Sequence, residues 1–401
     1  MLPVDLPRGF GAYVANVGIK DLTDDFTVVA SEVPCSSSAV FTRSRFAGPS
    51  VVVSRRNAAD RQLQAVVVVS KNANVATGAE GLANAEELCS SVARSVGVAP
   101  DDVLITSTGV IGRQYPMQRI RDHLAPYSAT ADSSTGGRLP LERHDAFDVA
   151  SAMMTTDTHP KVASATVGGA TVGDAARIVG VAKGVGMIEP DMATMLSFIF
   201  TDARIDADTL DRAFRSIVDQ TFNSLSVDTD TSTSDTAAIL ANGLAGDVDL
   251  VEFVSALRAV CLDLTRQLAR DGEGATKLLV VEVDSARDDA QAKRVAKSIL
   301  NSPLVKTAVH GADPNWGRVA MAIGKCSDDT DIDESRVRIR FGSEEVYPAQ
   351  VDENGLAELE GYLKGDEVLI SVDLGIAKGT ATVYGCDLSD GYVRINADYT
   401  T

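Results

Sequence analysis

Short apolar runs alternate with amphipathic stretches through the first half of the chain. The runs FTVVA (26–30), AVVVV (65–69) and DVLITS (102–107) are rich in β-branched residues and predict strands. Between the second and the third run, residues 81–97 show the apolar spacing of a helix face. Strands that alternate with helices predict an α/β fold.

The second half continues this alternation after Thr194. The apolar run that begins there predicts a strand, and two helices are expected at 206–222 and near 250–270. The longer helix carries apolar residues at intervals of three or four, at Leu250, Val254, Leu257, Cys261, Leu264 and Leu268. A strand at 277–283 follows, and Ser285 with Asp288 three residues later resembles a capping box that would begin another helix.

Strand-like runs dominate the C-terminal part of the chain. They are VRIRF (337–341), EVLISVDL (367–374), TATVYG (380–385) and YVRIN (392–396). A chain of 401 residues is long enough for two or three domains. These runs therefore predict a strand-rich C-terminal subdomain at roughly 285–401.

The charge balance restricts the classes of partner. The chain has 37 Lys and Arg against 56 Asp and Glu, a formal net charge of −19 at pH 7, which disfavours phosphate backbones and anionic lipids. Five cysteines, an odd number without a C-x-x-C pair, argue against a disulfide framework or a zinc ribbon. No targeting segment or membrane span is recognisable, so we expect a cytoplasmic protein that binds neither nucleic acid nor membrane.

Several common catalytic and metal-binding motifs are absent from the sequence. The chain lacks G-x-S-x-G, H-E-x-x-H and phosphate-loop motifs, and none of its four histidines has a nucleophile-like context. The acidic run DTDTSTSDT (228–236) resembles a calcium loop, but it lacks the Gly at the sixth position and the Glu at the twelfth. We therefore expect no metal.

The stretch KGVGMIEPDMAT (183–194) offers a nucleophile of another kind. A threonine hydroxyl becomes reactive when a base takes its proton, and the free α-amine of the same residue, with a pKa of about 7.7–8.0, can be that base. That amine exists only if the Ala193–Thr194 bond is cut, and the glycines and the proline before it would present that bond. The alternative is that Thr194 is an ordinary strand residue with a satisfied hydroxyl.

Extended to KGVGMIEPDMATMLSF (183–198), this stretch resembles the self-processing segment of the glutamate N-acetyltransferases, or ornithine acetyltransferases, of arginine biosynthesis. Other segments resemble the same family in its order: FTRSRFAGPS (41–50), NANVATG (72–78), STGVIG (107–112), MMTTDT (153–158), DTDTSTSDT (228–236), DGEGATK (271–277), SPLVKTAVHGADPNWGR (302–318) and GYVRINADYTT (391–401). They cover the chain nearly end to end. The sequence near Thr194 is especially similar to the members of clavulanic-acid-type clusters.

The resemblance implies catalytic roles for three residues. Cleavage between Ala193 and Thr194 would separate an α chain, residues 1–193, from a β chain, residues 194–401, and would expose Thr194 as the nucleophile. Thr108 and Gly109 match the oxyanion hole, in which a hydroxyl and a backbone N–H stabilise the tetrahedral intermediate.

The resemblance also implies the substrate-binding positions, which are Thr155, Lys183, Thr194, Glu273, Asn396 and Thr401. Lys183 can pair with a substrate carboxylate, and Glu273 and the terminal carboxylate can meet an ammonium. Two positions beside the nucleophile depart from the family pattern. Val185 stands where Ser or Ala is common, and Asp191 where Asn is common, so the cleavage rate or the donor preference could differ.

The fold implied by the resemblance is a self-processing αββα sandwich, like that of ornithine acetyltransferases and related aminopeptidases. The implied reaction moves acetyl from N2-acetyl-L-ornithine to L-glutamate through an acetyl-Thr194 intermediate. It needs no cofactor, because the donor carries its own acetyl group, and the cleaved chains would assemble as an α2β2 heterotetramer. The alternatives are a self-processing amidohydrolase or aminopeptidase of related fold, an enzyme that also uses acetyl-CoA, and a non-catalytic relative whose chain stays intact.

Overall fold

The computed structural model describes residues 2–20, 22–127, 137–168, 175–189, 195–349 and 351–398. Four residues named above lie outside the described residues. They are Asp191, Ala193, Thr194 and Thr401.

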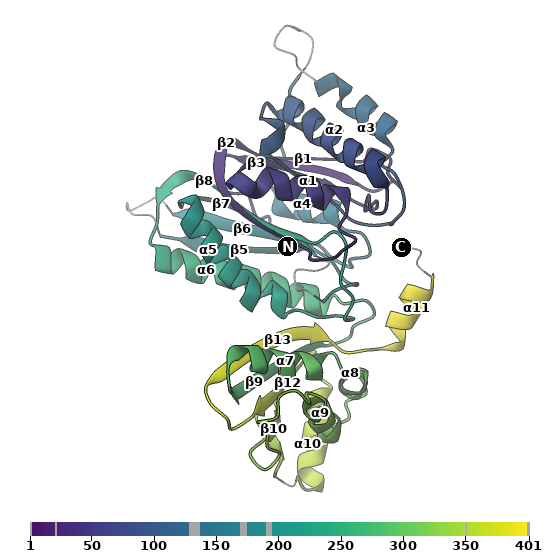
Figure 1. The fold of residues 1–401 in the computed structure, drawn as a ribbon, viewed down its shortest axis with the longest axis vertical. Coiled ribbons are helices and arrows are strands. Elements are labelled where there is room, and N and C mark those ends of the chain that lie inside the picture. Colours follow the sequence, from purple (N-terminus) through teal and green to yellow (C-terminus); the bar gives the residue numbers. More distant parts are fainter. Residues whose placement is uncertain are drawn as a thin grey trace.

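The larger of two sheets has eight strands in the order β4-β3-β2-β8-β7-β6-β5, with β1 paired to β2 (Figure 1). The strands are β1 (Phe10–Ala15), β2 (Phe26–Phe41), β3 (Gln62–Val69), β4 (Val103–Ser107), β5 (Lys161–Val167), β6 (Ala176–Lys183), β7 (Leu196–Arg204) and β8 (Thr236–Asp247). The first part of the long strand β2 pairs with β1 and β3, and its last part pairs with β8. One strand therefore belongs to both halves of the sheet.

These two halves face each other across an inner core. Buried side chains from β1–β4 and from β6–β8 form one cluster there, together with helix α4 (Ala146–Met153). Phe10 on β1 and Phe200 on β7 have ring centroids 5.2 Å apart within this core. The sheet thus supplies the two central layers of a sandwich.

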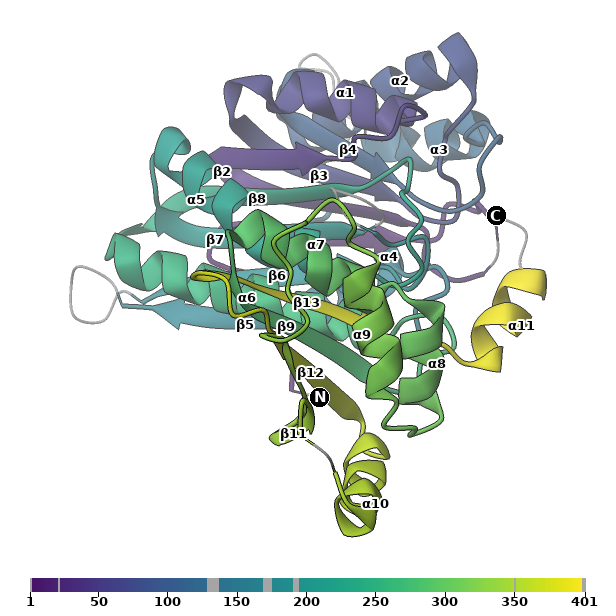
Figure 2. The same cartoon turned by 60° about the horizontal axis from the view of Figure 1, so that its bottom comes forward.

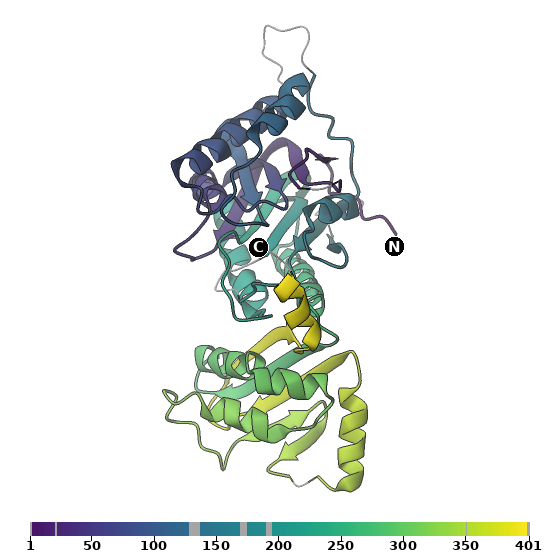
Figure 3. The same cartoon turned by 90° about the vertical axis from the view of Figure 1, so that its right-hand side faces the viewer.

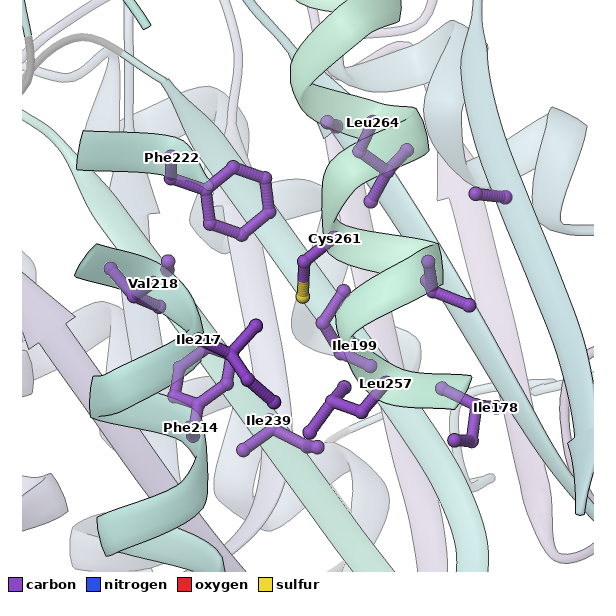
Figure 4. Close-up of a cluster of buried hydrophobic side chains, with 14 of the residues drawn as sticks. Ile178, Ile199, Phe214, Ile217, Val218, Phe222, Ile239, Leu257, Cys261 and Leu264 are labelled. Atoms are coloured by element: carbon purple, nitrogen blue, oxygen red, sulfur yellow. The ribbon is translucent and has the colours of Figure 1, made fainter. Parts of the chain in front are cut away.

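Helices cover both outer faces of the sandwich. Helices α1 (Pro49–Asn57), α2 (Gly78–Val96) and α3 (Met117–Leu124) pack outside β2–β4. Helices α5 (Ala207–Gln220) and α6 (Leu250–Arg270) pack outside β5–β8, and Figure 4 shows Phe214 and Ile217 of α5 meeting Leu257 and Cys261 of α6 there. The layers run α, β, β, α, so the predicted fold class is confirmed.

The valine run of β3 shows why its sequence lacks the alternation of a half-exposed strand. Val66 and Val68 point into the inner core, while Val67 and Val69 lie under the outer helices. Both faces of the strand are buried, and a strand buried on both faces reads as a continuous apolar run.

The smaller sheet has the order β11-β10-β12-β9-β13, with β9 and β12 parallel. Its strands are β9 (Leu278–Ala286), β10 (Arg338–Phe341), β11 (Glu344–Tyr347), β12 (Glu367–Asp373) and β13 (Gly379–Cys386). One face packs in a cluster with helices α7 (Asp289–Leu300), α8 (Pro303–His310), α9 (Trp316–Gly324) and α10 (Glu353–Leu363), which lie around it in Figure 2. On the other face, Leu278, Val280, Tyr384 and Cys386 join the cluster of α5 and α6, so α6 connects the two sheets.

Two predictions of secondary structure were wrong. YVRIN lies in helix α11 (Asp390–Asp398), shown in yellow in Figure 3. This helix lies at the level where the part built on the larger sheet meets the part built on the smaller sheet. Ser285 remains in β9, and the cap of α7 is Asp288, whose carboxylate accepts the Gln291 N–H at 2.8 Å. In both cases, the local pattern was compatible with more than one structure.

Short 3₁₀ helices complete the described elements. They are η1 (Ala58–Asp60), η2 (Pro100–Asp102), η3 (Ala125–Tyr127) and η4 (Phe222–Ser224). Within the described ranges, no helix combines the length and the apolar composition that a bilayer crossing requires.

Candidate active site

One cavity of about 100 Å³ brings together the predicted site residues that the structure describes. Its lining includes Thr108, Gly109, Thr155, Lys183, Glu273 and Asn396. These residues come from segments spread over most of the chain, so tertiary packing alone places them in a common wall. A larger groove of about 390 Å³ beside β2 and α5 contains none of them.

Thr108 and Gly109 follow the last residue of β4 at the cavity. The Thr108 N–H donates to the Val69 carbonyl at 3.1 Å and extends the pairing of β3 with β4. Its buried Oγ1 has no hydrogen-bond partner among the described residues. A buried hydroxyl without a partner is costly, so this atom is available to a bound oxygen.

Gly109 supplies the second donor position. Its φ of 131° lies where side chains are disfavoured, and a Cβ there would come within 2.2 Å of the Lys71 carbonyl carbon. No acceptor for its N–H is present in the described part of the chain. A hydroxyl and a backbone N–H on consecutive residues fit the donor pair of an oxyanion hole.

Lys183, the last residue of β6, brings a buried positive charge to the cavity. Its Nζ donates to Thr155 Oγ1 at 2.8 Å and lies 3.8 Å from Asp157 Oδ2. Burial lowers the pKa of Lys183, and the nearby Asp157 carboxylate opposes that shift. A buried ammonium with a carboxylate on one side is suited to bind a second carboxylate on the other.

Glu273 brings a carboxylate to the same cavity. Asn396 Nδ2 donates to Glu273 Oε2 at 2.8 Å, and Thr156 Oγ1 donates to Oε1 at 3.5 Å. Burial raises the pKa of Glu273, although Asn396 opposes that shift. With Lys183, the cavity offers one cation and one anion, which matches an amino acid with a carboxylate and an ammonium group.

The C-terminal helix α11 reaches this cavity through the loop that follows α6. Ser389 Oγ donates to the Gly274 carbonyl at 2.5 Å. Gly274 has a φ of 71°, and a Cβ there would lie 2.3 Å from the Tyr392 nitrogen. This close backbone approach explains how Asn396, near the end of the chain, meets Glu273.

Part of the acidic run at 228–236 also lines the cavity. Ser232, Thr233 and Ser234 line the cavity, and the Asp228 carboxylate accepts the Met187 N–H at 2.6 Å. The described residues hold no cluster of three or more His, Cys, Asp or Glu side chains arranged for a metal ion.

Asp235 is buried, and burial raises its pKa well above the usual range.

Residues on both sides of the predicted cleavage site are held by backbone hydrogen bonds. The Glu189 N–H donates to the Asp230 carbonyl at 3.0 Å, and the Thr236 N–H donates to the Met195 carbonyl at 3.1 Å. Val185, one of the two departures from the family pattern, lines the cavity. Residues 190–194, which include Ala193 and Thr194, lie outside the described part.

The sequence matches the ArgJ family over residues 11–401. The chain belongs to the ArgJ family. Glutamate N-acetyltransferase Oat2 of Streptomyces clavuligerus is 59% identical over 402 residues, 98% of each chain. Arginine biosynthesis bifunctional protein ArgJ 2 of Nostoc sp. is 54% identical over 396 residues, again 98% of each. A solved ArgJ structure from Bacillus halodurans has 45% sequence identity and a TM-score of 0.48, and covers 51% of this chain and 100% of its own. The family resemblance seen in the sequence is thus confirmed.

Sequence reasoning missed several charged residues behind the cavity of this ArgJ-family chain. Asp157 and Asp271 are buried and linked through the fully buried Lys161. Both aspartates belong to segments that resemble the family, MMTTDT and DGEGATK, so a signal for them was present. Lys161 lies outside every such segment, and only the folded structure places it between the two carboxylates.

Proposed function

We propose that this chain is an acyltransferase that moves the acetyl group of N2-acetyl-L-ornithine to L-glutamate, with L-ornithine and N-acetyl-L-glutamate as products. The observation that carries the proposal is the convergence on one cavity of an oxyanion-type donor pair, an ammonium and a carboxylate. Membership of the ArgJ family supports the same reaction.

In the proposed first step, Thr194 Oγ1 attacks the acetamide carbon of the donor while the α-amine of Thr194 takes the hydroxyl proton. Thr108 and Gly109 donate hydrogen bonds to the oxyanion that forms. Collapse of the intermediate breaks the C–N bond, and the departing ornithine amine receives the proton. The product of this half-reaction is an acetyl ester on Thr194.

In the second step, the α-amine of glutamate attacks the ester, and the Thr194 oxygen leaves and regains a proton. Lys183 binds the carboxylate of each amino acid, and Glu273 binds the side-chain ammonium of ornithine. Thr155, Asn396 and Thr401 complete the substrate contacts. The donor brings its own acetyl group, so the scheme needs no cofactor.

The mechanism requires cleavage between Ala193 and Thr194, which makes residues 1–193 an α chain and residues 194–401 a β chain. The described strands favour continued association after a cut. Lys183 of β6 pairs with Leu196 of β7, and β2 pairs with β8, so each of the two chains would supply neighbouring strands of one sheet. We extend the proposal to an α2β2 heterotetramer in the cytoplasm, with a role in arginine biosynthesis or a clavulanic-acid-type cluster.

Intact-mass measurement before and after incubation with N2-acetyl-L-ornithine tests the proposal. We expect two polypeptides that divide at Ala193–Thr194 and an acetyl adduct on the fragment that begins with Thr194. Thr194→Ala should give one full-length chain without an adduct. An active preparation that consists only of uncleaved chain contradicts the scheme.

The hydrolase alternative has a separate readout. If free acetate appears from N2-acetyl-L-ornithine at the same rate with and without L-glutamate, water is the acceptor and the transferase proposal fails. Release of free thiol from acetyl-CoA in the presence of L-glutamate would reveal the additional use of that donor.

A further inference from the structure

Four charged side chains form a continuous row that leads away from the cavity. Lys183 Nζ lies 3.8 Å from Asp157 Oδ2, and Asp157 Oδ1 accepts a hydrogen bond from Lys161 Nζ at 2.8 Å. Lys161 Nζ in turn donates to Asp271 Oδ2 at 2.5 Å. The charges alternate in sign and balance, and only Lys183 lines the cavity.

This row, which we call the ion row, is buried along its whole length. The side chains of Asp157 and Lys161 are 0% exposed, that of Asp271 is 3% exposed and that of Lys183 is 7% exposed. Buried ion pairs often stabilise a fold no better than apolar side chains of similar volume. Stability alone is therefore a weak explanation for four buried charges behind a substrate pocket.

The ion row also holds together the backbone segments that carry the pocket residues. The Asp157 carboxylate accepts the Thr155 N–H at 3.1 Å and the Gly184 N–H at 2.6 Å. Thr155 lines the cavity, and Gly184 directly follows Lys183. One buried carboxylate thus ties together two segments of the substrate-binding wall.

The far end of the row, where Asp271 Oδ1 lies 3.4 Å from Nδ1 of the partly exposed His159, reaches a third segment of that wall. Asp271 Oδ2 accepts the Thr158 N–H at 3.1 Å, and Asp271 lies two residues before Glu273. The Glu273 N–H donates to the Val185 carbonyl at 2.8 Å. The segments that carry Thr155, Lys183 and Glu273 are therefore joined through buried polar contacts.

The groups around the Lys183 ammonium shift its pKa in opposite directions. Burial lowers the pKa of Lys183, and Asp157 raises it. Lys161 lowers this pKa, while Asp235 and Glu273 raise it. Burial also raises the pKa of Asp157, but Lys183, Lys161 and the Gly184 N–H outweigh burial and lower it to about 2, so Asp157 is ionised at every working pH.

We propose that Asp157 and Lys161 are positioning residues that hold the Lys183 ammonium in place and set its charge for binding the substrate carboxylate, with Asp271 anchoring the far end of the row. This inference deepens the proposed function and rests on it for the identity of the substrate. It assigns a role in this ArgJ-family chain to residues that do not line the cavity and that act through Lys183.

Two variants test the proposal because they should shift the pKa of Lys183 in opposite directions. Asp157→Asn removes the nearest anion, so the alkaline limb of kcat/KM should move to lower pH by about one unit. Lys161→Met combined with Asp271→Asn removes one cation and one anion and leaves Asp157 to Lys183 alone. Its alkaline limb should move to higher pH. If these residues only stabilised the fold, the two variants would not move the alkaline limb in opposite directions.

A direct titration keeps this test separate from the proposed reaction. In protein with 13C-labelled lysine, the Lys183 signal, assigned with Lys183→Met, should titrate at lower pH in Asp157→Asn and at higher pH in the double variant. If these shifts occur in a protein that does not transfer acetyl, the positioning role survives and the proposed reaction fails. If acetyl is transferred and the Lys183 titration does not move, the positioning role is wrong.

The matched control is a surface ion pair remote from the cavity. Lys293 Nζ lies 2.9 Å from Asp219 Oδ1, so Lys293→Met also removes a paired lysine, and it should leave both readouts unchanged. If the double variant does not fold, Asp157→Asn still decides the question because Asn keeps the shape of Asp. An unchanged or upward Lys183 titration in that variant overturns the proposal.

Discussion

Asn396 Nδ2 donates a 2.8 Å hydrogen bond to Glu273 Oε2 across 123 residues of sequence. Helix α11 lies far from Glu273 along the chain, yet it supplies part of the same cavity wall. The contact orients a carboxylate whose pKa is raised by burial and partly restored by Asn396 itself. Under the proposed function, we therefore expect the C-terminal helix to influence substrate binding through Glu273.

Removal of the Asn396 amide should weaken substrate binding more than catalysis. We expect Asn396→Ala to raise KM for N2-acetyl-L-ornithine about tenfold or more, the effect of one hydrogen bond to a charged group, with little change in kcat. Initial-rate kinetics measure both constants. Arg394→Ala on the same helix, whose side chain is 79% exposed, is the control and should leave KM unchanged. A loss confined to kcat in Asn396→Ala contradicts the assigned role.

Glu273 should govern the acid side of the pH profile. Its pKa is raised by burial, so its carboxylate is neutralised at a higher pH than that of an exposed glutamate. We expect kcat/KM for the ornithine donor to fall with pH through that raised pKa, and Glu273→Gln to lower kcat/KM and remove this dependence. Profiles measured between pH 4 and pH 9 decide the question.

The same pKa shift predicts the effect of Glu273→Gln on stability. A carboxyl with a raised folded-state pKa contributes stability that is present below its unfolded pKa and is lost as the pH rises through the folded value. Glu273→Gln should therefore not lower the thermal unfolding midpoint at pH 8. A clear drop of the midpoint at pH 8 would show that Glu273 contributes to the stability of the fold instead of to substrate binding.

The unpartnered hydroxyl of Thr108 should matter to the reaction and little to the fold. We expect Thr108→Val to lower kcat about 100-fold or more, the usual cost of one oxyanion-hole donor, with a nearly unchanged unfolding midpoint. Thr106→Val is a close control, because Thr106 Oγ1 is also buried without a described partner but Thr106 does not line the cavity. Equal losses of kcat in the two variants argue against an oxyanion hole at Thr108.

Asp235 should destabilise the native state at neutral pH. Burial raises the pKa of Asp235 well above the usual range, and hydrogen bonds from Met195 and Thr42 do not outweigh that effect. The stability that Asp235 contributes is present below an unfolded pKa of about 3.9 and is lost as the pH rises through the folded value. Asp235→Asn should therefore have a higher thermal midpoint than the native sequence at pH 8, and the difference should vanish near pH 4.

Asp211 provides the opposite control for Asp235. It is also buried, and burial alone would raise its pKa, but Ser38 Oγ at 2.7 Å and Arg215 Nε at 2.9 Å outweigh burial and lower it. Its stabilising effect is present above the unfolded pKa and is lost as the pH falls through the folded value. Asp211→Asn should lower the midpoint at pH 8. Shifts of the same sign in both variants contradict this account of Asp235.

The elements that could be predicted from the sequence are those decided by short-range pattern. The valine run of β3 and the apolar face of α6 repeat over enough residues to select a strand or a helix. Where the pattern was short, it misled. YVRIN is β-like in composition, but it forms part of α11, which docks where Gly274 allows the backbones to approach.

The sequence by itself determined the α/β class, the family and the residue types of the candidate site, because local pattern and motif order are properties of the linear chain. Only the tertiary structure decided that Thr108, Lys183, Glu273 and Asn396 share one cavity. It also placed Lys161 between carboxylates 4 and 110 residues away. Such contacts depend on how sheets and helices pack, since a buried charge takes its partner from whichever segment the fold brings near it.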